Sequence, residues 1–490
     1  MILQLPQSLK KRLTPIFIAL AVLFGLGTAA IAWFIGDPLI LLLGVVGAGV
    51  MLVMLYRVEF GLLMLVFITF TRFSDVMIAY HGAPSIAKVF VPALLAVVFA
   101  RWVLFRVEPS PWLKTAVILG IYAMVGVGSL LYAQSFAATR NALEDFAKDA
   151  LITVVVVLIM REGITLRRAV WALLLGALFL SVLTTYQQFT GTFSNNYWGF
   201  AQAEPRQIGS VTSDYRLAGP ISANFYALVL VMIVPLALDR FWHEKSSLLR
   251  LLAAITLFTT IISIIFTYSR GGFLALIVVA GLMLWHRRTK PVYILAIAVT
   301  ALVVYQFVPA QYKARLSTLT ELVGLVSGNQ TAVSDTSIRG RQSEVTAAWE
   351  MFADHPIVGV GLANFNNNYL DYAKHLGLDT RGEERSAHSL YLEIAAETGI
   401  IGILAFSLIL GVAFQHLFLA YRTFLENGQR DYAYLTWALT VGLVGYLTGS
   451  LFLHLGYPRY FWLLIGLVIA TRYVADHEKA RLQKEATLTT

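Results

Sequence analysis

Two arginines stand at the edges of hydrophobic stretches in the middle of the chain. Arg216 opens Arg216-Leu217-Ala218-Gly219-Pro220, and Arg270 lies between two apolar runs with Gly271 and Gly272 behind it. A guanidinium near hydrocarbon is costly unless it has a partner, and no carboxylate is adjacent to either arginine in the sequence. A diphosphate would supply that partner through bidentate hydrogen bonds. The alternative is that each arginine snorkels to the interface and binds phospholipid phosphate.

A histidine is the second candidate for chemistry. His388 opens the apolar run His388-Ser389-Leu390-Tyr391-Leu392, and Glu393 and Glu397 follow within about two helical turns. A neutral imidazole accepts the proton of an attacking hydroxyl near neutral pH. The alternative is an interfacial or capping histidine, with Glu393 complementing a helix N-terminus.

Other kinds of chemistry find little support. The chain has no cysteine, which excludes thiol nucleophiles, thiolate metal sites and disulfides. The acidic residues Asp371, Asp379, Glu383 and Glu384 are scattered, so we predict no metal and no other cofactor. No glycine-rich phosphate loop with a following lysine points to ATP. The net charge of +9 is dispersed over short loops, which argues against nucleic acid.

The elements that must position these residues are membrane helices. Of the 490 residues, 58% are hydrophobic and 13% charged, which is typical of an integral membrane protein. We predict an all-α, polytopic membrane helix bundle of about 12 to 14 spans. Short segments such as 60–72 and 149–161 are expected to tilt, pair or dip into the membrane. The predicted spans are 14–35, 38–56, 60–72, 85–104, 112–132, 149–161, 167–190, 220–239, 248–268, 271–286, 291–308, 390–421, 432–453 and 459–475.

The spans divide the chain into four parts. They are an N-terminal bundle (1–308) with an outer loop (191–219), one large loop (309–389), the C-terminal helices (390–475) and a tail (476–490). Lys and Arg concentrate in the short loops of one side, so the positive-inside rule predicts cytoplasmic termini and an external large loop.

Both outer loops have a pattern of their own. In the first, Tyr197 and Trp198 either anchor the headgroup interface or stack on sugar rings. In the large loop, Val345, Ala348, Trp349 and Phe352 have helical spacing, and a turn with Pro356, Gly359 and Gly361 follows. We predict two or three short helices that lie over the bundle, in a loop with a function of its own.

Taken together, these segments resemble the O-antigen ligase and O-antigen polymerase superfamily of bacterial envelope glycosyltransferases. The resemblance covers roughly residues 210 to 405. The family more often has asparagine where this chain has Ser389. The motifs are Arg216-Leu217-x-Gly219, Ser269-Arg270-Gly271, the segment from Arg341 through Trp349, Pro356 and Gly359-Val360-Gly361 to Phe365, His388-Ser389-x-x-Leu392, and Glu397-x-Gly399-x-x-Gly402.

The resemblance implies a metal-independent, inverting glycosyltransferase of the bacterial inner membrane. It would move a glycan from undecaprenyl diphosphate to an acceptor hydroxyl on the periplasmic side. Arg216 and Arg270 would hold the diphosphate, His388 would act as the base, and Arg341 would assist donor binding or orient the loop. The supporting residues would be Tyr268, Ser269, Ser389 and Glu397.

The acceptor stays open at this point. Lipid A core would make the protein a ligase, a second lipid-linked glycan a polymerase, and a protein serine or threonine a protein glycosyltransferase. From other classes, a polytopic solute transporter and a non-catalytic scaffold remain as alternatives. A transporter more often has ionisable groups at the membrane midplane and inverted repeats, and we find neither in the sequence.

Overall fold

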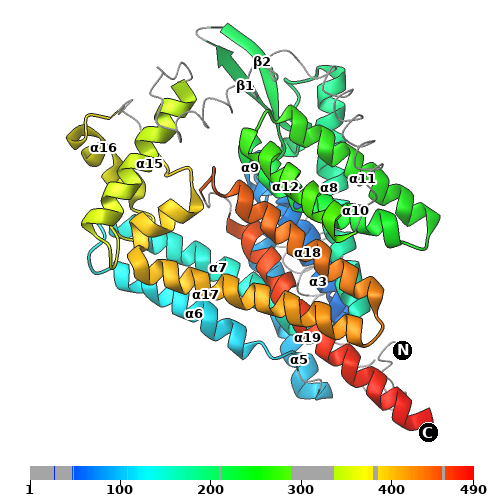
Figure 1. Ribbon diagram of the computed structural model, residues 1–490. Coiled ribbons are helices and arrows are strands. Elements are labelled where there is room, and N and C mark those ends of the chain that lie inside the picture. Colours follow the sequence, from blue (N-terminus) through cyan, green and yellow to red (C-terminus); the bar gives the residue numbers. More distant parts are fainter. Residues whose placement is uncertain are drawn as a thin grey trace.

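The computed structural model describes residues 49–106, 109–208, 211–287, 336–378, 385–454 and 458–489, together with Gly27 and Gly47. These residues are almost entirely helical, which confirms the predicted fold class (Figure 1). The helices are α3 (Val58–Thr71), α4 (Phe73–His81), α5 (Ile86–Phe105), α6 (Leu113–Ser129), α7 (Phe136–Ile159), α8 (Gly163–Thr190), the 3-10 turn η1 (Tyr197–Gly199), α9 (Ala223–Val231), α10 (Ile233–His243), α11 (Ser247–Phe266), α12 (Arg270–His286), α15 (Thr336–Asp354), α16 (Phe365–His375), α17 (Leu390–Glu426), α18 (Arg430–Gly449) and α19 (Pro458–Thr489).

Within the described residues, five helical stretches are long and apolar enough to cross a membrane. They are α5, α8, α9 with α10, α11 and α17. The pair α3 and α4 would make a sixth span, bent by 54°. Helices α6 and α12 are apolar but shorter. The chain is therefore a multi-pass helix bundle, and the predicted spans 14–35 and 291–308 lie outside the described residues.

One predicted segment was wrong in length. The stretch 149–161 is only the second half of α7, which has 24 residues and begins at Phe136. Its first half carries Arg140, Asp145 and Lys148, so hydrophobicity alone does not reveal it. A helix of 24 residues rises about 36 Å, and no dip into the membrane is needed to explain it.

Several helices begin at a serine. A serine Oγ accepts a hydrogen bond from the backbone N–H three residues on, which satisfies one of the donors left open at a helix start. Because these serines fix where each helix begins, they also fix the corners between helices. They are Ser85 before α5, Ser135 before α7, Ser246 before α11 and Ser269 before α12.

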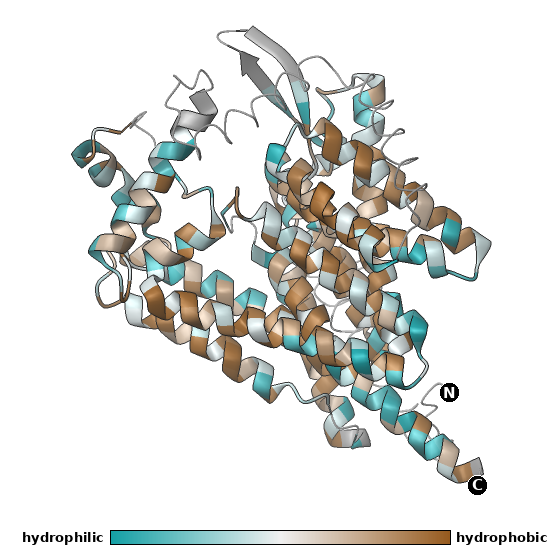
Figure 2. Cartoon of the chain, viewed as in Figure 1, coloured by the Kyte–Doolittle hydropathy of each residue, from teal (hydrophilic) through white to brown (hydrophobic). Residues whose placement is uncertain are grey.

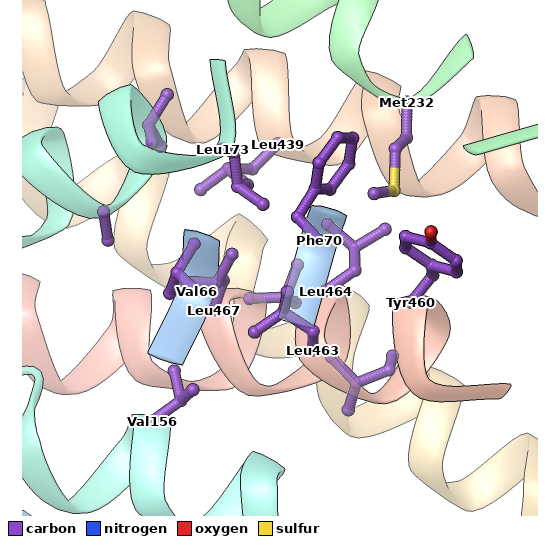
Figure 3. Packing of buried hydrophobic residues seen from close by; sticks show 14 of the residues in the cluster. Val66, Phe70, Val156, Leu173, Met232, Leu439, Tyr460, Leu463, Leu464 and Leu467 are labelled. Atoms are coloured by element: carbon purple, nitrogen blue, oxygen red, sulfur yellow. The ribbon is translucent and has the colours of Figure 1, made fainter. Parts of the chain in front are cut away.

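The core lies where α3, α8, α18 and α19 meet (Figure 3). Phe70 of α3 is completely buried and packs edge-on against Tyr460 of α19, with ring centroids 5.7 Å apart. Leu173 and Leu439 reach the same cluster from α8 and α18. The first half of α19 is thus an internal helix that the others surround.

Ion networks also join distant helices. Arg459 of α19 lies 3.1 Å from Asp75 of α4 and 3.1 Å from Asp149 of α7. At the other end of the bundle, the fully buried Arg240 of α10 pairs with Asp239 and with Asp431 of α18. Since unpaired buried charges are strongly destabilising, each network fixes the relative positions of the helices that contribute to it.

The outer loop 191–219 contains the described strands, which the sequence analysis did not predict. Strands β1 (Gln202–Ile208) and β2 (Val211–Ala218) form an antiparallel hairpin in which Glu204 pairs with Arg216. The hairpin lies above the ends of α8, α9 and α11 in Figure 1. Trp198, just before it, is 68% exposed.

Two helices, α15 and α16, form in the predicted large loop, in agreement with the predicted helical spacing. They share a small core in which Ala347, Ala348 and Met351 of α15 are fully buried, and many of the coloured residues of both helices are hydrophilic (Figure 2). The apolar face predicted for α15 was partly wrong, because the side chains of Val345 and Trp349 on it are 42% and 60% exposed. Small side chains line the buried face instead, which allows α15 to approach α17 closely.

Candidate active site

Arg216 is held at the base of the hairpin by contacts with Thr267, Asn224 and Glu204. Its Nε donates to the carbonyl of Thr267 at 2.9 Å, and its Nη2 donates to Asn224 Oδ1 at 2.6 Å. Its Nη1 lies 3.7 Å from Oε2 of Glu204, the residue opposite it in the hairpin. The sequence shows no adjacent carboxylate, but strand pairing supplies one, so a ligand is not required to balance this charge.

Arg270 begins α12 at the corner that receives Arg216. The carbonyl that Arg216 contacts belongs to Thr267, three residues before Arg270. Between them, Tyr268 is buried with a φ of +51°, and Ser269 caps α12 by accepting from Gly272 N. The predicted supporting residues Tyr268 and Ser269 therefore shape the corner.

Two basic residues belong to this corner. Arg270 is only 6% exposed and is the first residue of α12. The N-terminal end of a helix carries a partial positive charge that adds to that of the side chain. A basic side chain at a helix N-terminus is an arrangement that can bind an anion.

A short loop after α18 links this corner to His388. Phe452 of the loop covers Gly271, where an added Cβ would lie 3.1 Å from the Phe452 Cβ. Two carbonyls of the loop, those of Ser450 and Leu453, accept from Leu390 N at 3.0 and 2.9 Å. The arginine corner and the start of α17 thus contact the same loop.

His454 in that loop lies beside His388. The two imidazole rings meet edge to face, with centroids 5.9 Å apart. Burial, and then the nearby His388, lower the pKa of His454 to about 4. His454 is therefore neutral near neutral pH and adds no positive charge next to His388.

His388 itself is held in a defined orientation. Its backbone has a φ of +45°, and its side chain is 34% exposed. Nδ1 lies 3.0 Å from the Ser386 carbonyl and 2.7 Å from Glu344 Oε2. Because both neighbours are acceptors, Nδ1 carries the hydrogen, and Nε2 is the nitrogen that can accept a proton.

Glu344 and Arg385 were missed by the sequence reasoning. Glu344 lies on α15 with its side chain 2% exposed, and its Oε1 accepts from Arg385 Nη1 at 2.9 Å. The one available signal was position, since Glu344 precedes the buried Ala347 and Ala348 by three and four residues on the same helix face. A carboxylate on a buried face requires partners, but the sequence does not say which.

The remaining predicted residues fall around this centre. Arg341 lies on α15 one turn before Glu344. Ser389 is the N-cap of α17 but makes no side-chain capping bond. Glu397 is buried and accepts from Ala363 N at 2.8 Å and from Phe365 N at 3.1 Å, so it fastens the start of α16.

A close backbone crossing holds α15 and α16 against α17. Val360 N donates to the Ala396 carbonyl and Gly361 N to the Glu397 carbonyl, each at 2.9 Å. Two glycines make the contact possible. A Cβ on Gly359 would lie 2.3 Å from the Glu397 carbonyl carbon, and one on Gly399 would lie 2.4 Å from Ile357 backbone atoms. The glycines of the motif are thus needed to bring Glu344 to His388.

A cavity opens beside the first turns of α17. Its volume is about 260 Å³, and it lies between α6, α7, α17 and α19. Glu393, Glu397, Tyr122 and Trp462 are among its lining residues. Leu390, two residues after His388, also lines this cavity.

Among the described residues, no group of three or more His, Asp or Glu side chains could hold a metal ion. The acidic residues Asp379, Glu383 and Glu384 of the large loop lie outside the described part of the chain. The predicted metal independence therefore stays a prediction.

Comparison with known protein families gives a match that covers most of this site. The family model described as O-antigen ligase matches residues 255–407, which include the Arg270 corner, α15, His388 and the glycine crossing. Arg216 lies before the matched segment. No curated protein matches the chain. Residues 255–407 therefore match an O-antigen ligase domain, which supports membership of the chain in the O-antigen ligase superfamily.

Proposed function

We propose that the protein transfers a glycan from undecaprenyl diphosphate to an acceptor hydroxyl, with His388 as general base. The observation that supports this most strongly is the environment of the imidazole. Two acceptors hold the hydrogen on Nδ1, and the side chain stays 34% exposed, so Nε2 can meet a substrate hydroxyl.

In the proposed reaction, the acceptor oxygen forms a bond to the anomeric carbon of the donor sugar. The bond from that carbon to the diphosphate oxygen breaks, and the hydroxyl proton passes to His388 Nε2. Attack opposite to the leaving group inverts the anomeric centre. Undecaprenyl diphosphate leaves as an anion, which Arg216 and Arg270 stabilise through fixed guanidinium groups.

The contacts of Tyr268, Ser269 and Glu397 suit them to supporting roles. Tyr268 and Ser269 shape the corner that carries Arg270, and Glu397 fastens the loop. Arg341 lies one turn from Glu344, a position that favours orientation of the loop over direct contact with the diphosphate. We propose that neither a metal nor another cofactor takes part.

The cellular setting follows from the same proposal. The protein would lie in the bacterial inner membrane with its termini in the cytoplasm and the large loop in the periplasm. The description of the matched family favours lipid A core as the acceptor and thus a ligase. Polymerisation onto a second lipid-linked glycan remains the alternative.

Transfer by the purified protein tests this proposal. Wild-type protein in lipid nanodiscs is mixed with undecaprenyl-diphosphate-linked glycan and lipid A core, with EDTA present. We expect product with an inverted linkage, and a loss of at least about 100-fold in His388→Ala. A correctly folded His388→Ala with wild-type turnover would refute the proposal.

A further inference from the structure

We propose that Glu344 is a positioning residue, which orients His388 and stabilises the imidazolium that forms when Nε2 takes a proton. This inference rests on the proposed function of His388. It adds a residue to which the sequence analysis gave no role, within the motif segment from Arg341 through Trp349.

The burial of Glu344 is the first observation. Its side chain is 2% exposed, and a carboxylate removed from water is strongly destabilising unless it has partners. Arg385 supplies one partner, at Oε1. Gly340, one turn earlier on α15, makes room for that arginine, because an added Cβ would lie 2.7 Å from Arg385 Nη1. The pair is thus built into the face of α15.

The second carboxylate oxygen faces the histidine. Oε2 is buried, receives no well-aligned hydrogen bond from the described residues, and lies 2.7 Å from His388 Nδ1. In the structure, the hydrogen-bond partner of Nδ1 is the Ser386 carbonyl, at 3.0 Å. A small rotation of the ring would pass this hydrogen bond from the carbonyl to Oε2. Glu344 therefore offers a second, negatively charged acceptor to the same nitrogen.

The charges around the ring make Glu344 the closest compensation for an imidazolium. The groups that face His388 are Glu344 from α15, Arg385 from the preceding segment, and His454 with Glu393 behind it. His454 is neutral, and Glu393 lies 3.7 Å from His454 rather than against His388. When Nε2 accepts a proton, the new positive charge lies beside Glu344. A carboxylate in this position stabilises the imidazolium and keeps the ring in the productive tautomer.

The contact between Glu344 and His388 also depends on the docking of α15 against α17. Glu344 reaches His388 only because the crossing at Gly359 and Gly399 holds α15 against α17. The carboxylate beside His388 thus comes from a separate helix and lies 44 positions earlier in the chain.

The test compares kcat and KM of Glu344→Gln and Glu344→Leu with a control, Glu350→Gln, on the same helix. The substrates are those of the nanodisc assay above. We expect kcat to fall about 10-fold in Glu344→Gln, which keeps an acceptor, and about 100-fold in Glu344→Leu, with both KM values unchanged. Glu350→Gln should match wild type. An unchanged kcat in Glu344→Leu would overturn the inference.

A double variant separates positioning from structure. Glu344→Leu leaves Arg385 buried without its carboxylate, which by itself could destabilise α15. Glu344→Leu with Arg385→Leu removes both charges and should regain wild-type thermal stability. We expect kcat to stay low in this variant. Recovery of kcat together with stability would show that Glu344 only balances Arg385, and would overturn the inference.

A double-mutant cycle distinguishes this inference from the proposed function. If Glu344 acts through His388, adding Glu344→Gln to His388→Ala should not lower the residual rate further. A further 10-fold loss would overturn the role of Glu344 and leave that of His388 intact. Wild-type turnover in His388→Ala alone would instead refute the proposed function, and the inference with it.

Discussion

Gly399→Ala should undock α15 and α16 from the bundle. Gly399 has a φ of +60° and a ψ of −160°, a region that only glycine populates, so alanine costs about 1 to 3 kcal/mol there. The new Cβ would also lie 2.4 Å from the carbonyl carbon and oxygen of Ile357. These are backbone atoms, and they cannot turn away as the end of a flexible side chain can. The two segments must therefore separate.

The size of the effect follows from the hydrogen bonds at the crossing. The amides of Val360 and Gly361 donate to α17, and those of Ile400 and Ile401 donate back to the segment before Val360. Losing two of these bonds costs about 2 kcal/mol. With the backbone strain, the docked arrangement loses about 3 to 5 kcal/mol, which lowers its population relative to the undocked one by roughly 150- to 4,500-fold.

Limited proteolysis of the purified protein measures this docking, and transfer activity measures its consequence for His388. Gly428→Ala is the matched control, because Gly428 also has a positive φ, +72°, but no atom lies within 4 Å of the added Cβ. We expect faster cleavage within residues 336–378 and a loss of transfer in Gly399→Ala only. If Gly399→Ala and Gly428→Ala are cleaved at the same rate and have the same transfer activity, the backbone crossing does not hold the site together.

Three further predictions concern single residues. Arg270→Lys keeps the charge but loses the bidentate fork, so KM for the lipid-linked donor should rise about 10-fold in steady-state kinetics, and an unchanged KM would speak against diphosphate binding. Burial lowers the pKa of His454 in the folded protein to about 4, so protonation of this histidine favours the unfolded state. The free energy of unfolding should therefore fall by up to about 3 kcal/mol as the pH falls from about 6.5 to 4. The melting temperature of His454→Phe should therefore decrease less than that of wild type over this pH range, whereas parallel decreases would contradict the reasoning. Glu397→Gln can accept from only one of the two amides at the start of α16, so thermal stability should fall by about 1 to 3 kcal/mol, and an unchanged melting temperature would exclude this role.

Much of the bundle follows from hydrophobic length alone. The predicted spans 85–104 and 248–268 agree closely with α5 and α11. The start of α7 could not be found this way, because its first half is polar and largely exposed. The placement of His388 at the beginning of a helix could be inferred from its neighbours, since α17 begins at Leu390.

The contact partners of the site residues could not be predicted from the sequence. Glu204 reaches Arg216 through strand pairing, and a hairpin register depends on geometry that a short polar segment does not reveal. Glu344 reaches His388 only after α15 docks, so the pair depends on the fold as a whole. The glycines of the motif could be named from the sequence, but their backbone contacts could not.

The most direct test of the central claim is the profile of lipid-linked and surface glycans in a deletion strain, complemented with wild type or with His388→Ala, read by gel and mass spectrometry. We predict that His388→Ala, at normal expression, accumulates undecaprenyl-linked glycan as the deletion does. Long unattached chains would indicate a ligase, and single repeats a polymerase. A glycan profile equal to wild type would contradict the account.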